Sequence, residues 1–417
     1  MRMVAIMAFR PRTVRVSAAI THPSSAVEND AVNVVRVLAA VAVVISHVRT
    51  LLIVDYDDAP HDLVQHLLFG TTALGKQAVV VFFVLSGFWV GGSVLRRSAQ
   101  QRFRWSDYAV DRVVRLSLVL VPALVLTALL DAVGKGMFPT SSVYVGSDLY
   151  AGVVAAQPPS DSWGLWIANA LFLVGVATPS FGSNAALWSV GYEFWMYAVG
   201  AVVVVAAVRR RRLEIGLAVT ALVCCAVLNP DLLLYLVVWL LGAGVAALHP
   251  LWSRLTLLVP RLLVPARVLA ATTTIGAALL VRGLNDLPLW SATALVAVPA
   301  AALLATLASW PTSAARRGFS GLASRLSASS YSLYAIHVPV AVFLTAALGV
   351  QASGRWSADA LHWFLVLAGT VLLVAAGWAF SLVTERRTAS VRAVVRHAIG
   401  RLARREDRSG AGSVLRS

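Results

Sequence analysis

Residues 36–47 read Arg-Val-Leu-Ala-Ala-Val-Ala-Val-Val-Ile-Ser-His, an apolar run closed at each end by an ionisable side chain. The run lies in a longer apolar segment over 33–54, which suffices to cross ~30 Å of hydrocarbon as a helix. Comparable segments recur along nearly all of the 417 residues, which are 59% hydrophobic and only 13% charged. The mean hydropathy of +0.78 is too high for a soluble globular protein. The sequence therefore predicts an all-α integral membrane protein.

The basic residues indicate how these segments cross the membrane, because cytoplasmic loops retain an excess of arginine and lysine. About ten spans place every arginine-rich loop in the cytoplasm, whereas about eleven would put the run Arg209–Arg212 outside. We expect the short segment 164–178 to be re-entrant or to lie along the outer interface. Both chain termini are then cytoplasmic. The apolar segments cover residues 33–54, 77–95, 113–131, 164–178, 187–208, 213–229, 231–248, 266–281, 287–309, 329–349 and 360–383.

The charge pattern also predicts the domain organisation: a basic cytoplasmic arm over 1–30, a membrane domain over 31–387 and a basic cytoplasmic tail over 388–417. The net charge of +16 comes from arginines between apolar runs, so we expect membrane lipids and not nucleic acid as partners. Cys224 and Cys225 are adjacent and form neither a loop-closing disulfide nor a metal site. This organisation is typical of a multi-pass protein of the cell membrane.

Arg36 and His47 are candidate functional residues because an ionisable side chain inside a span costs several kcal/mol unless it is paired or faces water. Eleven helical steps of ~100° bring the two side chains to within about 20° of one face, about 16 Å apart along the axis. Arg36 then lies near the inner membrane face and His47 in the outer half. The structural alternative is that both side chains reach out to the two interfaces.

Two further motifs follow His47. The run Val-Phe-Phe-Val-Leu-Ser-Gly-Phe-Trp places Ser86 and Gly87 where a neighbouring helix or a substrate can approach the backbone closely, and helix packing alone also explains it. Arg112 and Arg115 share one helix face at the inner start of the third span, a spacing suited to holding phosphate. Positive-inside retention is the structural alternative for this pair.

The second half of the chain adds two polar clusters inside apolar segments. The run Trp-Ser-Val-Gly-Tyr-Glu ends in Glu193, a carboxylate that needs a cation or a proton inside a span. A structural ion pair with an arginine of another span is the alternative. Ser330, Tyr331, Ser332, Tyr334 and His337 form an unusually polar run, for which interhelical hydrogen bonding is the alternative.

Taken together, these motifs resemble the acyltransferase-3 family of membrane O-acyltransferases, which includes surface-polysaccharide acetylases and macrolide acyltransferases. The resemblance runs from about Asn33 to about Arg387, with the motifs in the family's order and spacing. It implies acyl-CoA, with acetyl-CoA first among the candidates, as a cytoplasmic donor and no permanently bound cofactor. Glu385 resembles the family's closing acidic residue, but Arg387 and Thr388 replace the proline often found soon after it.

The chemistry of acyl transfer to a hydroxyl then suggests a role for each candidate residue. Neutral imidazole is well matched to remove the hydroxyl proton, so His47 is the expected base. Ser86, Tyr331 or His337 would stabilise the oxyanion, and Arg36, Arg112 and Arg115 would hold the donor. The second expected catalytic residue, Glu193, either orients His47 or pairs with Arg36.

The expected function is therefore transfer of an acyl group, acetyl or another short one, from acyl-CoA to a carbohydrate-containing acceptor. Candidate acceptors are a surface polysaccharide, a glycolipid and a glycosylated natural product. A transporter or flippase is the alternative, because buried arginine, glutamate and histidine also mark transport pathways. A transporter would move its substrate without consuming acyl-CoA.

Overall fold

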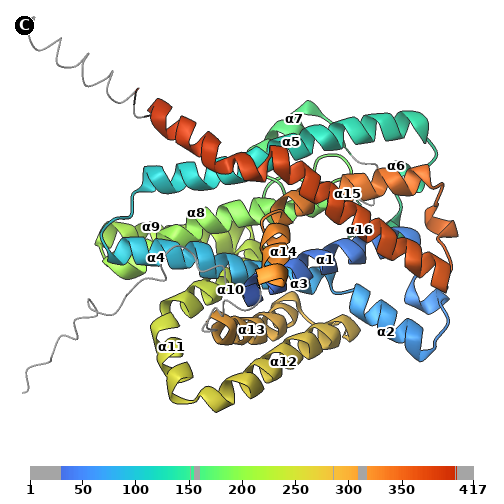
Figure 1. Cartoon of the computed structure of the whole chain (residues 1–417). Coiled ribbons are helices and arrows are strands. Elements are labelled where there is room, and N and C mark those ends of the chain that lie inside the picture. The colour runs from blue at the N-terminus through green and yellow to red at the C-terminus, as the bar shows by residue number, and fades with distance from the viewer. Residues whose placement is uncertain are drawn as a thin grey trace, which may run out of the picture.

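The computed structural model describes residues 30–150, 152–154, 160–284, 286–308, 317–399 and 401, with the side chains of 256–257 and 317–321 left out. This part of the chain is a bundle of helices (Figure 1). The α-helices are α1 (Asp30–Leu52), α2 (Leu63–Thr72), α3 (Gly75–Ser86), α4 (Gly92–Ala99), α5 (Trp105–Met137), α6 (Ser142–Val145), α7 (Trp163–Ala170), α8 (Trp188–Arg209), α9 (Arg212–Leu228), α10 (Pro230–Ala247), α11 (His249–Leu258), α12 (Leu263–Gly283), α13 (Leu289–Ala308), α14 (Arg317–Ser327), α15 (Ser330–Ala347) and α16 (Ala360–Val383). Shorter turns of helix are η2 (Tyr56–Asp58), η3 (Gly87–Gly91), η4 (Asp148–Tyr150), η5 (Ala185–Leu187), η6 (Pro260–Leu262), η8 (Ala352–Gly354) and η9 (Glu385–Arg387).

The prediction of an all-α integral membrane protein is confirmed. Within the described residues, 9 helical segments are long and apolar enough to cross a membrane. The tenth predicted span is α9, whose 17 residues lie at the lower limit for crossing. The α-helix in segment 164–178 is α7, whose 8 residues begin at Trp163 and are too few to cross a membrane. This length is compatible with the predicted re-entrant or interfacial placement. Large apolar side chains such as Val227, Leu269 and Val371 are exposed and would face lipid.

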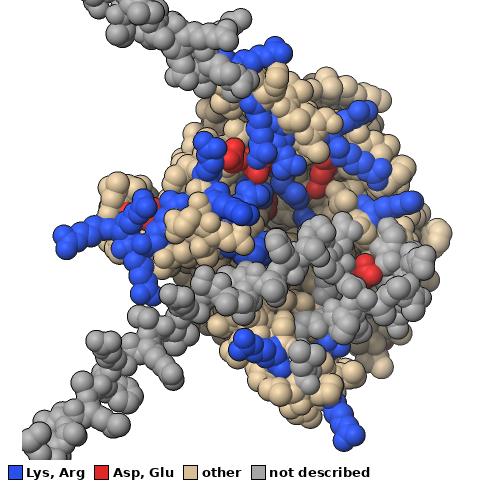
Figure 2. All heavy atoms as spheres, turned by 60° about the vertical axis from the view of Figure 1, so that its left-hand side comes forward, with Lys and Arg blue, Asp and Glu red and all other residues tan. Residues whose placement is uncertain are grey.

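Basic and acidic residues gather at opposite ends of the bundle. Arg96 and Arg97 end α4, and Arg209–Arg212 connect α8 to α9, at the left of Figure 1. On the face seen from that side, lysine and arginine side chains are widespread and acidic side chains are few (Figure 2). The acidic turn η2 follows the C-terminal end of α1 and lies beside α2, away from these arginines. We call the arginine-rich end the basic face, and it is the face that the charge pattern assigned to the cytoplasm.

The predicted terminal domains are only partly described. All of the predicted arm except Asp30 lies outside the described residues, as does most of the tail beyond residue 399. The described start of the tail, residues 388–399, is helical and continues the line of α16 at the basic face (Figure 1).

Helices α3 and α10 are in unusually close contact. A Cβ at Gly87 would overlap the backbone oxygen of Trp239, and one at Gly242 would overlap the backbone oxygen of Val84. The glycines therefore let the backbones of α3 and α10 come into contact. Of the two partners expected to approach Gly87, a neighbouring helix or a substrate, the structure shows the neighbouring helix. At this contact the α-helix widens into the π-helical turn η3, a feature frequent at functional sites.

Candidate active site

A cavity of about 590 Å³ opens between α1, α3, α5, α8 and α15. Five arginines and two glutamates line it, so its wall carries an excess of positive charge. Six of the eight residues predicted for the site line this one cavity, and His47 and His337 are not among its lining residues. Its lining residues include Arg36, Phe82, Ser86, Trp89, Arg97, Arg112, Arg115, Ser189, Glu193, Tyr197, Tyr331, Tyr334, Glu385 and Arg386.

The arginines predicted to hold the donor are positioned by aromatic rings and one carboxylate. The guanidinium of Arg36 lies 5.4 Å from the centre of the Trp89 ring. The guanidinium of Arg112 lies 5.7 Å from the ring of Tyr197, and its Nε is buried without a hydrogen-bond partner in the described chain. Stacking on aromatic rings stabilises a guanidinium while leaving its N–H donors for a ligand.

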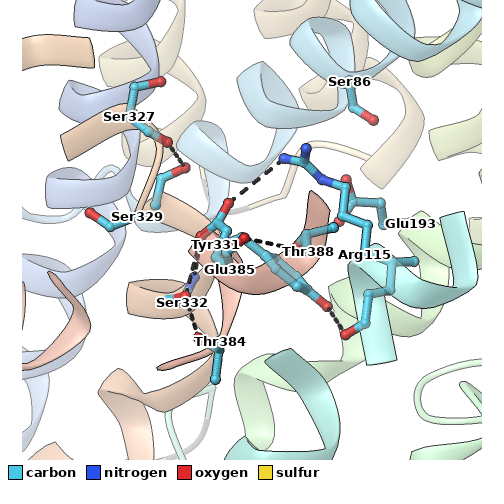
Figure 3. A network of polar contacts seen from close by, with 12 residues as sticks. Ser86, Arg115, Glu193, Ser327, Ser329, Tyr331, Ser332, Thr384, Glu385 and Thr388 are labelled. Atoms are coloured by element: carbon cyan, nitrogen blue, oxygen red, sulfur yellow. Dashed lines mark hydrogen bonds and ion pairs between the residues drawn. The ribbon is translucent and has the colours of Figure 1, made fainter. Parts of the chain in front are cut away.

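Glu385 is a cavity residue whose role the sequence left open. Its carboxylate lies 3.7 Å from Arg115 and accepts hydrogen bonds from the backbone N–H and hydroxyl of Ser332, both 3.2 Å long (Figure 3). It therefore joins the end of α16 to the start of α15 and fixes Arg115 at the cavity wall. An acidic residue directly after the last apolar run was the available sequence signal.

A directional chain of hydrogen bonds ends at Glu193. The indole N–H of Trp239 donates to Ser86 Oγ over 3.2 Å, and the Ser86 hydroxyl donates to Tyr197 over 3.4 Å. The Tyr197 hydroxyl in turn donates to the Glu193 carboxylate. The hydrogen bond of Glu193 is therefore to Tyr197, and neither of the two partners expected for it, His47 or Arg36, accepts or donates one to it in the described chain.

His47 instead contacts His337, from α15. Their rings are nearly parallel, and Nδ1 of His47 lies 2.9 Å from Nε2 of His337. Nδ1 of His337 lies 2.7 Å from the backbone oxygen of Tyr334, so this nitrogen must donate. A neutral imidazole has one N–H, hence Nε2 of His337 accepts and Nδ1 of His47 donates. This arrangement leaves the lone pair of His47 on Nε2.

The second ring nitrogen of His47, Nε2, has no hydrogen-bond partner among the described residues. His47 is only partly buried, whereas His337 is fully buried. Tyr334 links this pair to the cavity, because its ring lies in the cavity wall and 5.5 Å from the His337 ring. The histidine pair therefore adjoins one end of the cavity, and Arg36 lies on the same helix as His47, toward the basic face.

The three candidates for oxyanion stabilisation already donate their protons to protein atoms. Ser86 donates to Tyr197, Tyr331 donates to the backbone oxygen of Leu116 over 3.3 Å, and His337 donates to the backbone of Tyr334. Ser86, Tyr331 and His337 thus hold parts of the site in place in the structure as it stands. The pairing of residues 47 and 337 across the bundle was not predicted from the sequence.

The fold is that of a multi-pass membrane protein with a cationic cavity beside paired histidines. A family model described as an acyltransferase domain matches residues 29–381, nearly the whole chain. The chain therefore belongs to the acyltransferase-3 family, as its motifs indicated, and the protein is an acyltransferase. Searches of the curated proteins and of the solved structures gave no match.

Proposed function

We propose that the protein transfers a short acyl group, such as acetyl, from acyl-CoA to a hydroxyl of a sugar-containing acceptor, with His47 as the base. The observation that carries this proposal is the contact of His47 Nδ1 with His337 Nε2, together with that of His337 Nδ1 with a backbone oxygen, which assigns the lone pair of His47 to Nε2. Imidazole in this form removes a proton from a hydroxyl near neutral pH.

The reaction balances with the groups at hand. His47 Nε2 takes the acceptor's hydroxyl proton as that oxygen attacks the thioester carbonyl carbon. The tetrahedral intermediate then collapses, the C–S bond breaks, and the CoA thiolate takes the proton from the His47 imidazolium. The products are an ester of the acceptor and free CoA, and the enzyme returns to its starting state.

The arginine-lined cavity supports acyl-CoA as the donor. CoA carries several phosphate charges at one end and a thioester at the other, joined by a long, neutral arm. Arg112 and Arg115 would bind phosphate, Arg36 would contact the arm or the pyrophosphate, and the thioester would lie near His47. The first helix carries both Arg36 and His47, about 16 Å apart at ~1.5 Å per residue, which suits an extended arm.

A sugar-containing acceptor, in the form of a surface polysaccharide, a glycolipid or a glycosylated natural product, would reach His47 from the side away from the basic face. The protein would then lie in the cell membrane with its basic face in the cytoplasm, where acyl-CoA is found. The charge asymmetry between the two ends of the bundle supports this orientation.

The proposal is tested with membranes that contain the protein and acetyl-CoA labelled in its acetyl group. Label should enter a glycan or glycolipid fraction, with one CoA thiol released per acetyl group transferred. His47→Ala should lower this transfer roughly 100-fold or more, as expected for loss of a general base. Transfer at the normal rate by a folded His47→Ala protein would contradict the assignment of the base.

A further inference from the structure

A second arginine cluster lies at the basic face around one buried carboxylate. Asp111, on the first turns of α5, has a side chain only 4% exposed. Arg396 Nη2 lies 2.7 Å from its Oδ1 and Arg392 Nη1 lies 3.5 Å from the same oxygen. Arg97, at the end of α4, lies 3.8 Å from Oδ2. Three guanidiniums, one from α4 and two from the helix over 388–399, therefore share one negative charge.

This cluster has more positive charge than is needed to neutralise Asp111 in a structural ion pair. One arginine would neutralise Asp111, and the helix over 388–399 already supplies two. The arginine side chains are 35–47% exposed whereas the carboxylate is buried, so each of them also has surface open to solvent. Guanidiniums arranged in this way are suited to a phosphate group, which accepts forked hydrogen bonds.

The cluster is continuous with the cavity through Arg97, which contacts Asp111 and also lines the cavity. A ligand whose arm enters the cavity can therefore place a distal phosphate on the cluster. Figure 2 shows that arginine and lysine continue across this face, which would draw an anion toward it.

We propose that Arg97, Arg392 and Arg396 form a binding site for a phosphate monoester, and that its occupant is the 3′-phosphate at the nucleotide end of CoA. The inference rests on acyl-CoA being the donor. It gives the helix over 388–399, which lies beyond the matched family region, a direct part in donor recognition.

The test compares binding of acetyl-CoA and 3′-dephospho-acetyl-CoA by calorimetry, with the full-length protein in nanodiscs of neutral lipid. Wild type should bind acetyl-CoA at least tenfold more tightly, as one strong charge-assisted contact provides. Arg392→Gln/Arg396→Gln should remove that preference and leave affinity for the dephospho ligand unchanged. Arg254→Gln/Arg261→Gln, which changes two exposed arginines elsewhere on the chain, should keep the preference.

Asp111→Asn gives a test with the opposite sign. It removes the competing negative charge and keeps an acceptor for the arginines, so it should strengthen binding of acetyl-CoA severalfold and not that of the dephospho ligand. Equal binding of both ligands by wild type, or equal weakening of both in the double variant, would overturn the inference.

A lipid phosphate is the competing occupant. If phosphatidylglycerol is added to the nanodisc and displaces no acetyl-CoA, this result supports the assignment. Binding of that lipid through Arg392 and Arg396, without any preference between the two CoA ligands, would overturn it. If wild type bound neither CoA ligand, the proposed function itself would fail, which is a separate outcome.

Discussion

His47 Nδ1 and His337 Nε2 lie 2.9 Å apart, between residues separated by 290 positions in the chain. Because His337 Nδ1 donates to a backbone oxygen, this contact fixes the tautomer of both rings. Under the proposed function, His337 is a positioning residue that acts through His47. A buried carboxylate has the comparable role in serine hydrolases, but here the partner is neutral.

Replacing His337 should reduce turnover without reducing donor affinity. In His337→Ala the tautomer of His47 is no longer fixed, so we expect kcat to fall roughly 10- to 100-fold while the KM for acyl-CoA stays constant. His337→Gln, which can present an acceptor oxygen, should restore part of the rate. Steady-state kinetics and the Tm, measured for each variant, distinguish this role from a packing role, because loss of packing would lower the Tm and raise KM.

Arg36 should contribute to donor binding and not to the chemical step. Its guanidinium stacks on Trp89 inside the cavity, so Arg36→Gln should weaken acyl-CoA binding roughly tenfold or more, the loss of one charged hydrogen bond. The rate at saturating donor should change little. Arg254→Gln, at an exposed position on α11, is the matched control. An unchanged KM in the Arg36 variant would favour the structural alternative, in which Arg36 only reaches out to the interface.

The ion pair between Asp55 and Arg355 should respond asymmetrically to mutation. Arg355 Nη2 lies 2.6 Å from Asp55, and the arginine side chain is 3% exposed whereas the aspartate is 50% exposed. Asp55→Ala leaves a buried charge without its partner and should cost about 3 kcal/mol. Arg355→Met leaves only an exposed carboxylate and should cost about 1 kcal/mol or less. Unfolding measurements in one detergent should give this order, and the reverse order would contradict the burial argument.

Gly87→Ala should destabilise the protein, because the new Cβ would overlap the backbone of Trp239. Separation of α3 from α10 to relieve the overlap should cost about 1–3 kcal/mol and lower activity, since Ser86 and Trp239 belong to the hydrogen-bond chain to Glu193. Gly216→Ala is the matched control, because nothing lies within 4 Å of a Cβ there. That variant should be neutral or slightly stabilising in thermal unfolding.

Much of the site was predictable because it depends on local spacing. Arg36 and His47 share α1, and Arg112 and Arg115 share α5, so helical periodicity brings each pair to one face. Charge counting likewise kept segment 164–178 from being assigned as a span. Each of these inferences requires only the periodicity of one helix or the rule that cytoplasmic loops are rich in arginine and lysine.

What was not predictable depends on packing between distant segments. The partner of His47 comes from α15, and the partner of Glu193 is the tyrosine one turn further along α8 instead of an arginine of another span. The π-helical turn η3 begins at Gly87, where α10 approaches closely, and no local pattern encodes that contact. Glu385 becomes interpretable only when Arg115 and Ser332 are seen beside it.

The most direct test of the central claim is calorimetric titration of acetyl-CoA into the purified wild-type protein and into Arg112→Ala/Arg115→Ala of equal thermal stability. We predict saturable binding at one site for wild type, weakened at least tenfold in the double variant because the two arginines proposed to bind phosphate are lost. Absence of acetyl-CoA binding by well-folded wild-type protein would contradict the proposal that this cavity receives an acyl-CoA donor.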